Sequence, residues 1–308
     1  MSNRRSVLKG VLGGVASVAL APLASRALAA GNVQVSRVTD ELALLTGAGG
    51  NVLALATDGG RVLVDSGAAE LGDVLLATLG ELPGAGRVQT LFNTHWHLDQ
   101  VGSNAAIGRM GAAIIAHEKT RLRLATDYYL PAEDRYQKAF PAEAQPTETF
   151  YTDGETIVDG VRIEYGYLLE AHTDGDIYVF FRNANVLAVG DVVSPARDPV
   201  LDWFGGGWLG GRVDALDRLL KISDPQTRFV PSYGPVIGRA EVQAERDMML
   251  VLFERMVELV REGQSAEDVL AEGVMNDLSR SFDDPLKFLH DAHKGLWAHH
   301  NTLSPDVV

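Results

Sequence analysis

The sequence predicts an α/β fold in which sheets form the core and helices cover them. The chain has 308 residues, of which 46% are hydrophobic, and this is enough to bury one large core or two fused halves. Short β-rich runs separated by glycine turns come first, and buried strands then alternate with segments of helical spacing. From about residue 240 onward, the apolar positions recur mainly at helical spacing. These observations favour a sheet-rich protein with its helices outside, in one domain.

The expected strands and helices follow from local apolar patterns. Glycine-rich turns at 47–50 and 58–60 separate the first strands and predict hairpins. β-rich or continuously apolar runs predict strands at 33–38, 42–45, 52–56, 61–64, 88–94, 112–116, 162–167, 177–181 and 186–189. Helical spacing predicts helices at 71–82, 103–110, 213–222, 240–262, 266–271 and 285–298. Residues 127–149, rich in Tyr, Pro and Glu, are expected to form a polar loop.

The first thirty residues differ in character from the rest. Arg4 and Arg5 precede an apolar run at 11–23, and the small-residue pattern Ala27-Leu28-Ala29 follows. This pattern resembles a twin-arginine export signal that is cleaved after Ala29. A retained anchor is the weaker alternative, because the run is shorter than the about 20 residues that a spanning helix needs. We therefore expect residues 1–29 to be a signal peptide that engages the twin-arginine machinery, and the mature protein to be periplasmic or secreted.

The composition limits the partners and the metal ligands. The formal net charge is −14, and such a surface repels nucleic acid and anionic lipid, so we expect neither as a partner, nor a membrane after signal cleavage. The expected partner is a small-molecule substrate. The sequence contains no cysteine, which excludes disulfides and thiolate ligands. Any metal must be held by His, Asp, Glu or similar ligands.

Candidate metal ligands follow several of the strand-like runs. His95 and His97, with Asp99 two residues later, lie between an apolar strand and a helix. Two imidazoles at this spacing can converge on a cation if the segment is a loop. His172 and Asp191 also come directly after strand-like runs. Because α/β proteins gather their sites at the carboxyl ends of strands, these residues predict a metal site there.

Four short motifs resemble the successive ligand motifs of the metallo-β-lactamase superfamily in order and separation. They are HWHLDQ, AHTDGD, VGD and PSYGP. The earlier segments TGAGGNV and VDSG resemble the opening strands of that family, so the resemblance covers about residues 33–240. It implies a four-layer αβ/βα sandwich of two similar halves, with the metals at one edge of the sheets. Residues 30–308 would form this domain, with a C-terminal helical extension at about 240–308.

The resemblance also implies the ligands of a first metal. In the family this metal is bound by the two histidines of the opening motif and by the histidine of the third motif. Here those positions are His95, His97 and His172, and the expected ion is Zn²⁺.

The ligands of a second metal are altered. The corresponding positions here are Asp99, Gln100, Asp191 and Tyr233, and the family has histidines where Gln100 and Tyr233 stand. An amide oxygen and a phenol with a pKa near 10 are poorer zinc ligands than imidazole. We therefore expect one tight zinc ion and at most a weak second metal, held by Asp99 and Asp191 with Gln100 as a weaker ligand. Restoring both histidines is expected to add a second zinc ion.

The resulting functional prediction is an exported hydrolase that uses a zinc-activated water on a carbonyl substrate, which is an ester, thioester, lactone or lactam. Asp99 is expected to orient that water or accept its proton, and Tyr233 to donate to the developing oxyanion. Two alternatives stay open. One is an iron-dependent oxygenase on the same fold, and the other is a non-catalytic metal-binding protein.

Other residues carry weaker expectations. His117 lies outside the four motifs and is expected at the surface or behind the ligands. Asp65 either supports a ligand histidine or only forms a turn. The aromatic segment at 203–211 either forms one wall of a pocket or packs in the core. Tyr128 and Tyr129 are expected mainly to pack their loop. The histidines at 290–300 either fold over the edge of the site and replace a missing ligand or, as we expect, are solvated.

Overall fold

The computed structural model describes residues 33–83, 86–130 and 134–299. The chain divides into two units, residues 1–30 and 31–308, and the description below concerns the second. The expected signal peptide therefore lies outside the described residues.

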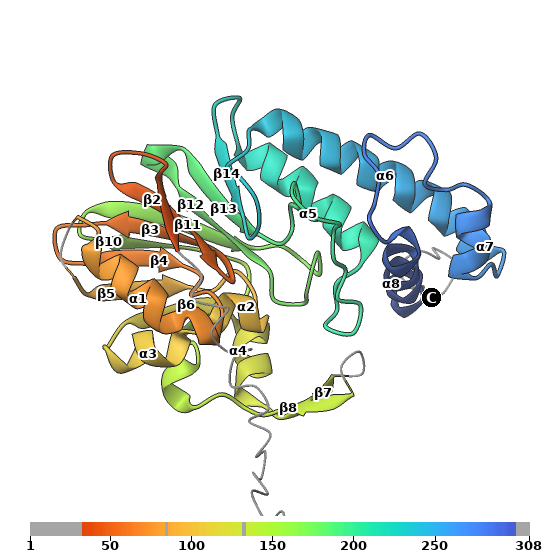
Figure 1. Cartoon of the computed structure of the whole chain (residues 1–308). Coiled ribbons are helices and arrows are strands. Elements are labelled where there is room, and N and C mark those ends of the chain that lie inside the picture. Colours follow the sequence, from red (N-terminus) through yellow and green to blue (C-terminus); the bar gives the residue numbers. More distant parts are fainter. Residues whose placement is uncertain (1–32, 84–85, 131–133, 300–308) are drawn as a thin grey trace, which may run out of the picture. The chain divides into compact units, whose positions relative to one another are not determined.

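Two sheets form the centre of this unit (Figure 1). The seven-stranded sheet contains, in spatial order, β1 (Gln34–Arg37), β2 (Leu42–Ala48), β3 (Gly50–Ala56), β4 (Arg61–Val64), β5 (Val88–Phe92), β6 (Ala113–His117) and β9 (Glu148–Phe150). The five-stranded sheet contains, in spatial order, β10 (Asp153–Val158), β11 (Val161–Tyr167), β12 (Ile177–Phe181), β13 (Val186–Gly190) and β14 (Arg228–Pro231). A separate antiparallel ribbon consists of β7 (Tyr128–Leu130) and β8 (Arg135–Gln137).

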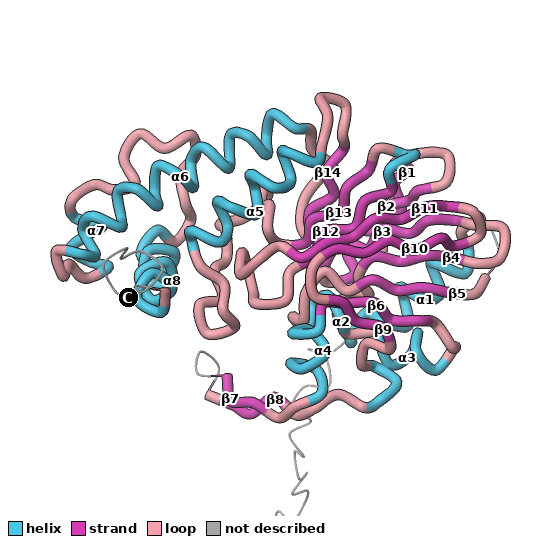
Figure 2. The backbone as a smooth tube through the Cα atoms, turned by 180° about the vertical axis from the view of Figure 1, so that it is seen from behind, coloured by secondary structure: helices cyan, strands magenta, loops and turns pink. Residues whose placement is uncertain are grey.

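Helices cover the outer faces of the two sheets (Figure 2). The described helices are α1 (Gly72–Glu81), α2 (Leu98–Val101), α3 (Asn104–Arg109), α4 (Glu118–Ala125), α5 (Leu209–Ile222), α6 (Arg239–Arg261), α7 (Ala266–Ala271) and α8 (Pro285–Ala298). Of these, α7 and α8 pack against other helices, on α5, on α6 and on each other. None of the helices in the described part of the chain has the length and apolar character that a membrane crossing requires.

The layers follow from the alternation of side chains along the strands. In β3, Leu53 and Leu55 belong to the core between the sheets, whereas Val52 and Ala54 pack against the α1 side. In β12, Val179 faces the other sheet and Phe180 belongs to the cluster formed with α5 and α6. Because both faces of these strands are buried, their sequences are continuously apolar. The result is a four-layer αβ/βα sandwich, which confirms the predicted fold class.

Several elements were not predicted from the sequence. Strand β10 is exposed at alternate positions and contains Asp153, Gly154 and Glu155, so its apolar signal is weak. Helix α4 is short and largely polar, and β14 has only four residues. The expected loop at 127–149 instead contains the β7–β8 ribbon, a 3-10 helix at Ala142–Ala144 and the start of β9. The segment is polar, but backbone pairing of Tyr128 with Gln137 makes part of it a β-ribbon and not the loop that its composition predicts.

Candidate metal centre

The predicted ligands come together at the carboxyl ends of strands from both sheets. His95 and His97 lie in the loop between β5 and α2, and His172 lies in the loop between β11 and β12. Asp191 directly follows β13, and Tyr233 lies in the turn after β14. Segments far apart in sequence therefore meet at one edge of the sandwich, as expected.

Hydrogen bonds fix the proton of each ligand histidine on the nitrogen that faces away from the centre. His172 Nδ1 lies 2.8 Å from the carbonyl oxygen of Val200, which can only accept, so Nδ1 carries the proton. His97 Nε2 likewise donates to Asp202 Oδ2 at 2.9 Å. The lone pairs of His172 Nε2 and His97 Nδ1 remain, and these two atoms face each other at 3.0 Å.

Asp65 fixes the orientation of the third histidine, His95, through the hydroxyl group of Thr94. The Thr94 hydroxyl donates to Asp65 Oδ2 at 2.8 Å, so its oxygen accepts from His95 Nδ1 at 3.0 Å. The Thr94 amide also donates to Asp65 Oδ1 at 2.8 Å. Asp65 is thus more than a turn residue, although its backbone has the φ of +63° that suits a turn aspartate.

The three histidines fit a metal ion. Their ligand nitrogens lie within 4.8 Å of one another. His95 Nε2 is buried without a hydrogen-bond partner, and opposed lone pairs at 3.0 Å repel each other unless a cation or a proton lies between them. Three neutral imidazoles aimed at one point form the ligand set of a three-histidine metal site.

Burial favours the metal-binding form of two of these histidines. It lowers the pKa of His95 and His172 well below the usual value, and neighbouring histidines add to this effect. Burial also acts to lower the pKa of His97, but the hydrogen bond and charge of Asp202 outweigh it and raise the pKa. Protons therefore compete with the metal mainly at His97.

Asp176 shapes the loop that carries His172. Its Oδ2 accepts from the backbone amides of His172 at 2.6 Å and Thr173 at 2.7 Å, and its Oδ1 accepts from the Thr173 hydroxyl at 2.7 Å. Burial raises the pKa of Asp176 to about 7. This carboxyl group holds the ligand loop.

The carboxylates expected to bind a second metal are bound by protein donors. Arg197 Nη2 donates to Asp191 Oδ2 at 2.7 Å. The Tyr233 hydroxyl and the Gln100 amide both donate to Asp99 Oδ2, the latter at 3.2 Å. Arg197 was not foreseen from the sequence, and its only signal was its position in the loop that follows Asp191.

The pKa shifts of Asp99 and Tyr233 indicate which of the two groups carries the proton. Burial acts to raise the pKa of Asp99, but the hydrogen bond from Tyr233 and the charge of His97 outweigh it and lower the pKa. Burial raises the pKa of Tyr233, and the bond to Asp99 raises it further. Tyr233 is therefore a neutral phenol that donates to an ionised carboxylate. Its expected role as a donor to the substrate stays a prediction.

The turn that carries Tyr233 is held by the opposite sheet. Asn51, at the start of β3, donates its side-chain amide to the carbonyl oxygens of Pro231 and Gly234 at 2.8 and 2.9 Å. Its backbone amide donates to the Ser232 carbonyl at 2.7 Å. The asparagine of the early TGAGGNV segment thus links the two sheets at the site.

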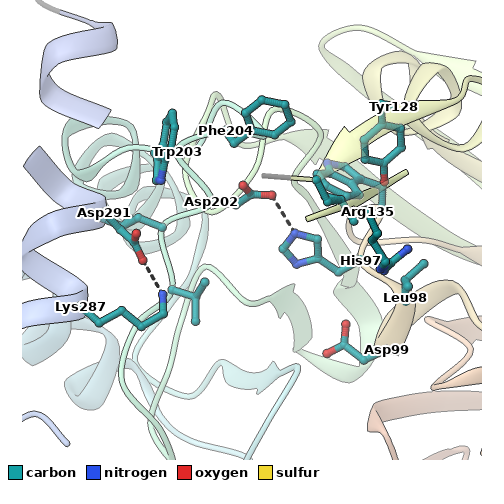
Figure 3. Close-up of a pocket in the computed structure, with 14 residues that line it drawn as sticks. His97, Leu98, Asp99, Tyr128, Arg135, Asp202, Trp203, Phe204, Lys287 and Asp291 are labelled. Atoms are coloured by element: carbon teal, nitrogen blue, oxygen red, sulfur yellow. Dashed lines mark hydrogen bonds and ion pairs between the residues drawn. The ribbon is translucent and has the colours of Figure 1, made fainter. Parts of the chain in front are cut away.

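A pocket of about 460 Å³ opens beside the histidines. Figure 3 shows His97 between a wall with Trp203 and Lys287 and a wall with Tyr128 and Arg135. The complete lining is Trp96, His97, Leu98, Asp99, Tyr128, Leu130, Arg135, Val200, Leu201, Asp202, Trp203, Phe204, Lys287 and Asp291. The pocket is mainly apolar, and the contributions of β8 and α8 were not predicted.

Most of the remaining candidates lie outside this site. His117 stacks on Tyr167 at 3.8 Å between ring centroids and caps the start of α4. Trp208 is buried and stacks on His299 at 4.4 Å, so the aromatic segment supplies both a pocket wall and a core residue. His299 also contacts Glu170, which shows that the C-terminal histidines are not all simply solvated. Tyr129 packs against Tyr136.

The fold and the three-histidine site define an α/β sandwich built to hold a metal at its edge. The model of the metallo-beta-lactamase superfamily matches residues 45–245, more than half of the chain. The chain belongs to this superfamily, which supports a metal-dependent hydrolase in general. A comparison with curated proteins finds no match.

Solved structures share this fold. A metallo-beta-lactamase from Pontibacter korlensis has 22% identity, with 71% of this chain and 99% of that chain covered and a TM-score of 0.57. The DIM-1 metallo-beta-lactamase has 17% identity, with 71% and 97% covered and a TM-score of 0.56. The stereoselective inverting sec-alkylsulfatase Pisa1 from Pseudomonas sp. has 15% identity, with 87% and 50% covered and a TM-score of 0.65. This chain thus spans about half the length of the alkylsulfatase, and at these identities the likeness concerns the fold.

Proposed function

We propose that this protein is an exported zinc hydrolase that acts on a carbonyl substrate, which is an ester, thioester, lactone or lactam. The observation that carries this proposal is the convergence of three imidazole lone pairs beside an open, mainly apolar pocket. A zinc ion held in this way acts as a Lewis acid and lowers the pKa of water towards about 7.

The residues of the chain have distinct roles in this proposal. His95, His97 and His172 hold the ion, and the aromatic pocket wall binds the substrate and excludes water. Asp99 lines the pocket, and its Oδ1 is not used by Tyr233 or Gln100. We assign to Asp99 the acceptance of the proton that the attacking water loses. Tyr233 holds Asp99 in position through its hydroxyl group.

Replacing Asp99 by asparagine tests this assignment. The amide keeps the shape of the side chain but cannot accept the proton, so kcat should fall by roughly 10²–10⁴-fold. Zinc content should remain near that of the original protein, because none of the three histidines is changed. Both quantities are measured on the same preparation, by elemental analysis and steady-state kinetics. Asp247→Asn, at an exposed position of helix α6, is the matched control. A parallel loss of zinc and turnover in Asp99→Asn contradicts the assignment.

The substrate class and the alternatives are separated by two further measurements. Chromogenic esters, thioesters, lactones and β-lactams test the carbonyl proposal, and an alkyl sulfate tests the chemistry named for the alkylsulfatase relative.

Elemental analysis after purification without added metal tests the iron oxygenase, since iron with O₂-dependent turnover would support it. The three histidines form a ligand set typical of zinc, whereas iron-dependent oxygenases typically use two histidines and a carboxylate. The ligand set therefore favours zinc over iron. A full metal site without turnover on any substrate would support the non-catalytic alternative.

Export through the twin-arginine route is a separate proposal. A reporter fused to residues 1–35 should reach the periplasm only in cells with an intact twin-arginine system, because Arg4 and Arg5 form the recognised pair. Cell fractionation measures this. The double variant Arg4→Lys, Arg5→Lys should remain in the cytoplasm, and its efficient export would refute the proposal.

A further inference from the structure

Arg197 binds one of the two acidic residues that were expected to hold a second metal, and it reaches the other through Tyr233. Its guanidinium binds Asp191 Oδ2 at 2.7 Å, and the same oxygen lies 3.8 Å from His95 Nε2 and 3.6 Å from His172 Nε2. The Asp191 oxygen nearest the histidine cluster is therefore already neutralised by a cation of the protein.

The same guanidinium contacts Tyr233 on its other side. The Arg197 Cζ lies 3.6 Å from the centre of the Tyr233 ring, and the Tyr233 hydroxyl donates to Asp99. Asp99, Tyr233, Arg197 and Asp191 thus form a continuous chain of contacts. The two carboxylates have protein donors, and the tyrosine that replaces an imidazole serves as a platform for the cation.

The loop that carries Arg197 is held firmly in this position. Arg280 donates to the carbonyl oxygens of Ser194 and Arg197, and Glu245 on α6 accepts from the Ser194 amide. The turn after β14 packs closely against this loop, since a Cβ on Gly234 would lie 2.7 Å from Ala196 Cβ. Gly234 also has a φ of +95°, which favours glycine.

We propose that Arg197 is a resident cation that takes the place of a second metal ion, so that the chain binds one metal. The guanidinium carries a positive charge, and this charge repels a second cation. This inference concerns metal number and does not depend on the substrate. It also revises the expectation that Gln100→His with Tyr233→His would suffice to add a second zinc ion.

Metal content tests the proposal directly. Each protein is equilibrated with excess Zn²⁺, freed of unbound metal and analysed for zinc per chain. The original protein and the double variant Gln100→His, Tyr233→His should each contain about one ion. Adding Arg197→Ala to the double variant should raise the content to about two. Adding Arg182→Ala instead, which removes a surface arginine bound to Glu164, should leave it at one.

The outcomes separate clearly. Two tightly bound ions in the original protein or in the double variant would overturn the proposal, as would a folded triple variant with Arg197→Ala that still binds one. If that triple variant does not fold, the single variants Arg197→Ala and Arg197→Lys replace it in a zinc titration followed by calorimetry. The alanine variant should bind a second ion at least about tenfold more tightly than the lysine variant, which keeps the charge. Equal second-ion affinities would refute the inference.

Discussion

Replacing His172 by alanine is expected to abolish tight metal binding. The change leaves two imidazoles and removes the lone pair that faces His97 Nδ1 at 3.0 Å. Changes in residues that only support ligands typically reduce metal affinity by 10–100-fold, so the loss of a ligand should exceed about 100-fold. Competition with a chromophoric chelator measures the affinity, and circular dichroism checks that the variant is folded.

His117→Ala is the matched control for this experiment. The His117 ring stacks on Tyr167 and its Nδ1 accepts from the Lys119 amide, so it contributes to packing and to the start of α4. Its removal should lower stability slightly and leave metal content unchanged. Equal metal loss in the two variants would show that His117 has been wrongly placed outside the site.

The fold was predictable from the sequence wherever burial produces a clear apolar pattern. Strands such as β12 and β13 are buried on both faces, and helix α6 has a regular apolar spacing, so composition and period identify them. Strand β10 alternates between exposed and half-buried positions without a strong apolar face. The β7–β8 ribbon depends on pairing within a polar segment, which no period reveals.

The site was predictable to the extent that its residues belong to short motifs. The three histidines occur in such motifs, and the structure brings them together. No such motif contains Arg197, Asp202 or Arg280. Each lies in a loop, and its contact with the site depends on the path of that loop in the folded chain. The altered residues Gln100 and Tyr233 showed that the second site had changed, but the residue that now neutralises Asp191 could be identified only from the structure.

The buried ion pair between Arg212 and Glu245 is expected to be a major determinant of stability. Arg212 on α5 is fully buried, Glu245 on α6 is 7% exposed, and their charged atoms lie 2.9 Å apart. The carboxylate also accepts from the Ser194 amide, and Arg212 donates to the Ser194 hydroxyl. The pair therefore joins two helices to the loop between Asp191 and Arg197.

Glu245→Leu should lower the free energy of unfolding by about 3–5 kcal/mol, because it leaves the Arg212 charge buried and unpaired. Adding Arg212→Met should recover much of this loss, since an apolar pair of similar volume requires no desolvation of charge. Urea unfolding at a fixed zinc concentration measures the three proteins under comparable conditions. Arg246→Ala, which breaks the partly exposed pair with Asp217 on the same two helices, should cost at most about 1 kcal/mol. If Glu245→Leu costs no more than this surface control, the buried pair does not hold α5 and α6 together. The anchoring of the Arg197 loop must then be assigned to Arg280 and to packing against the Gly234 turn.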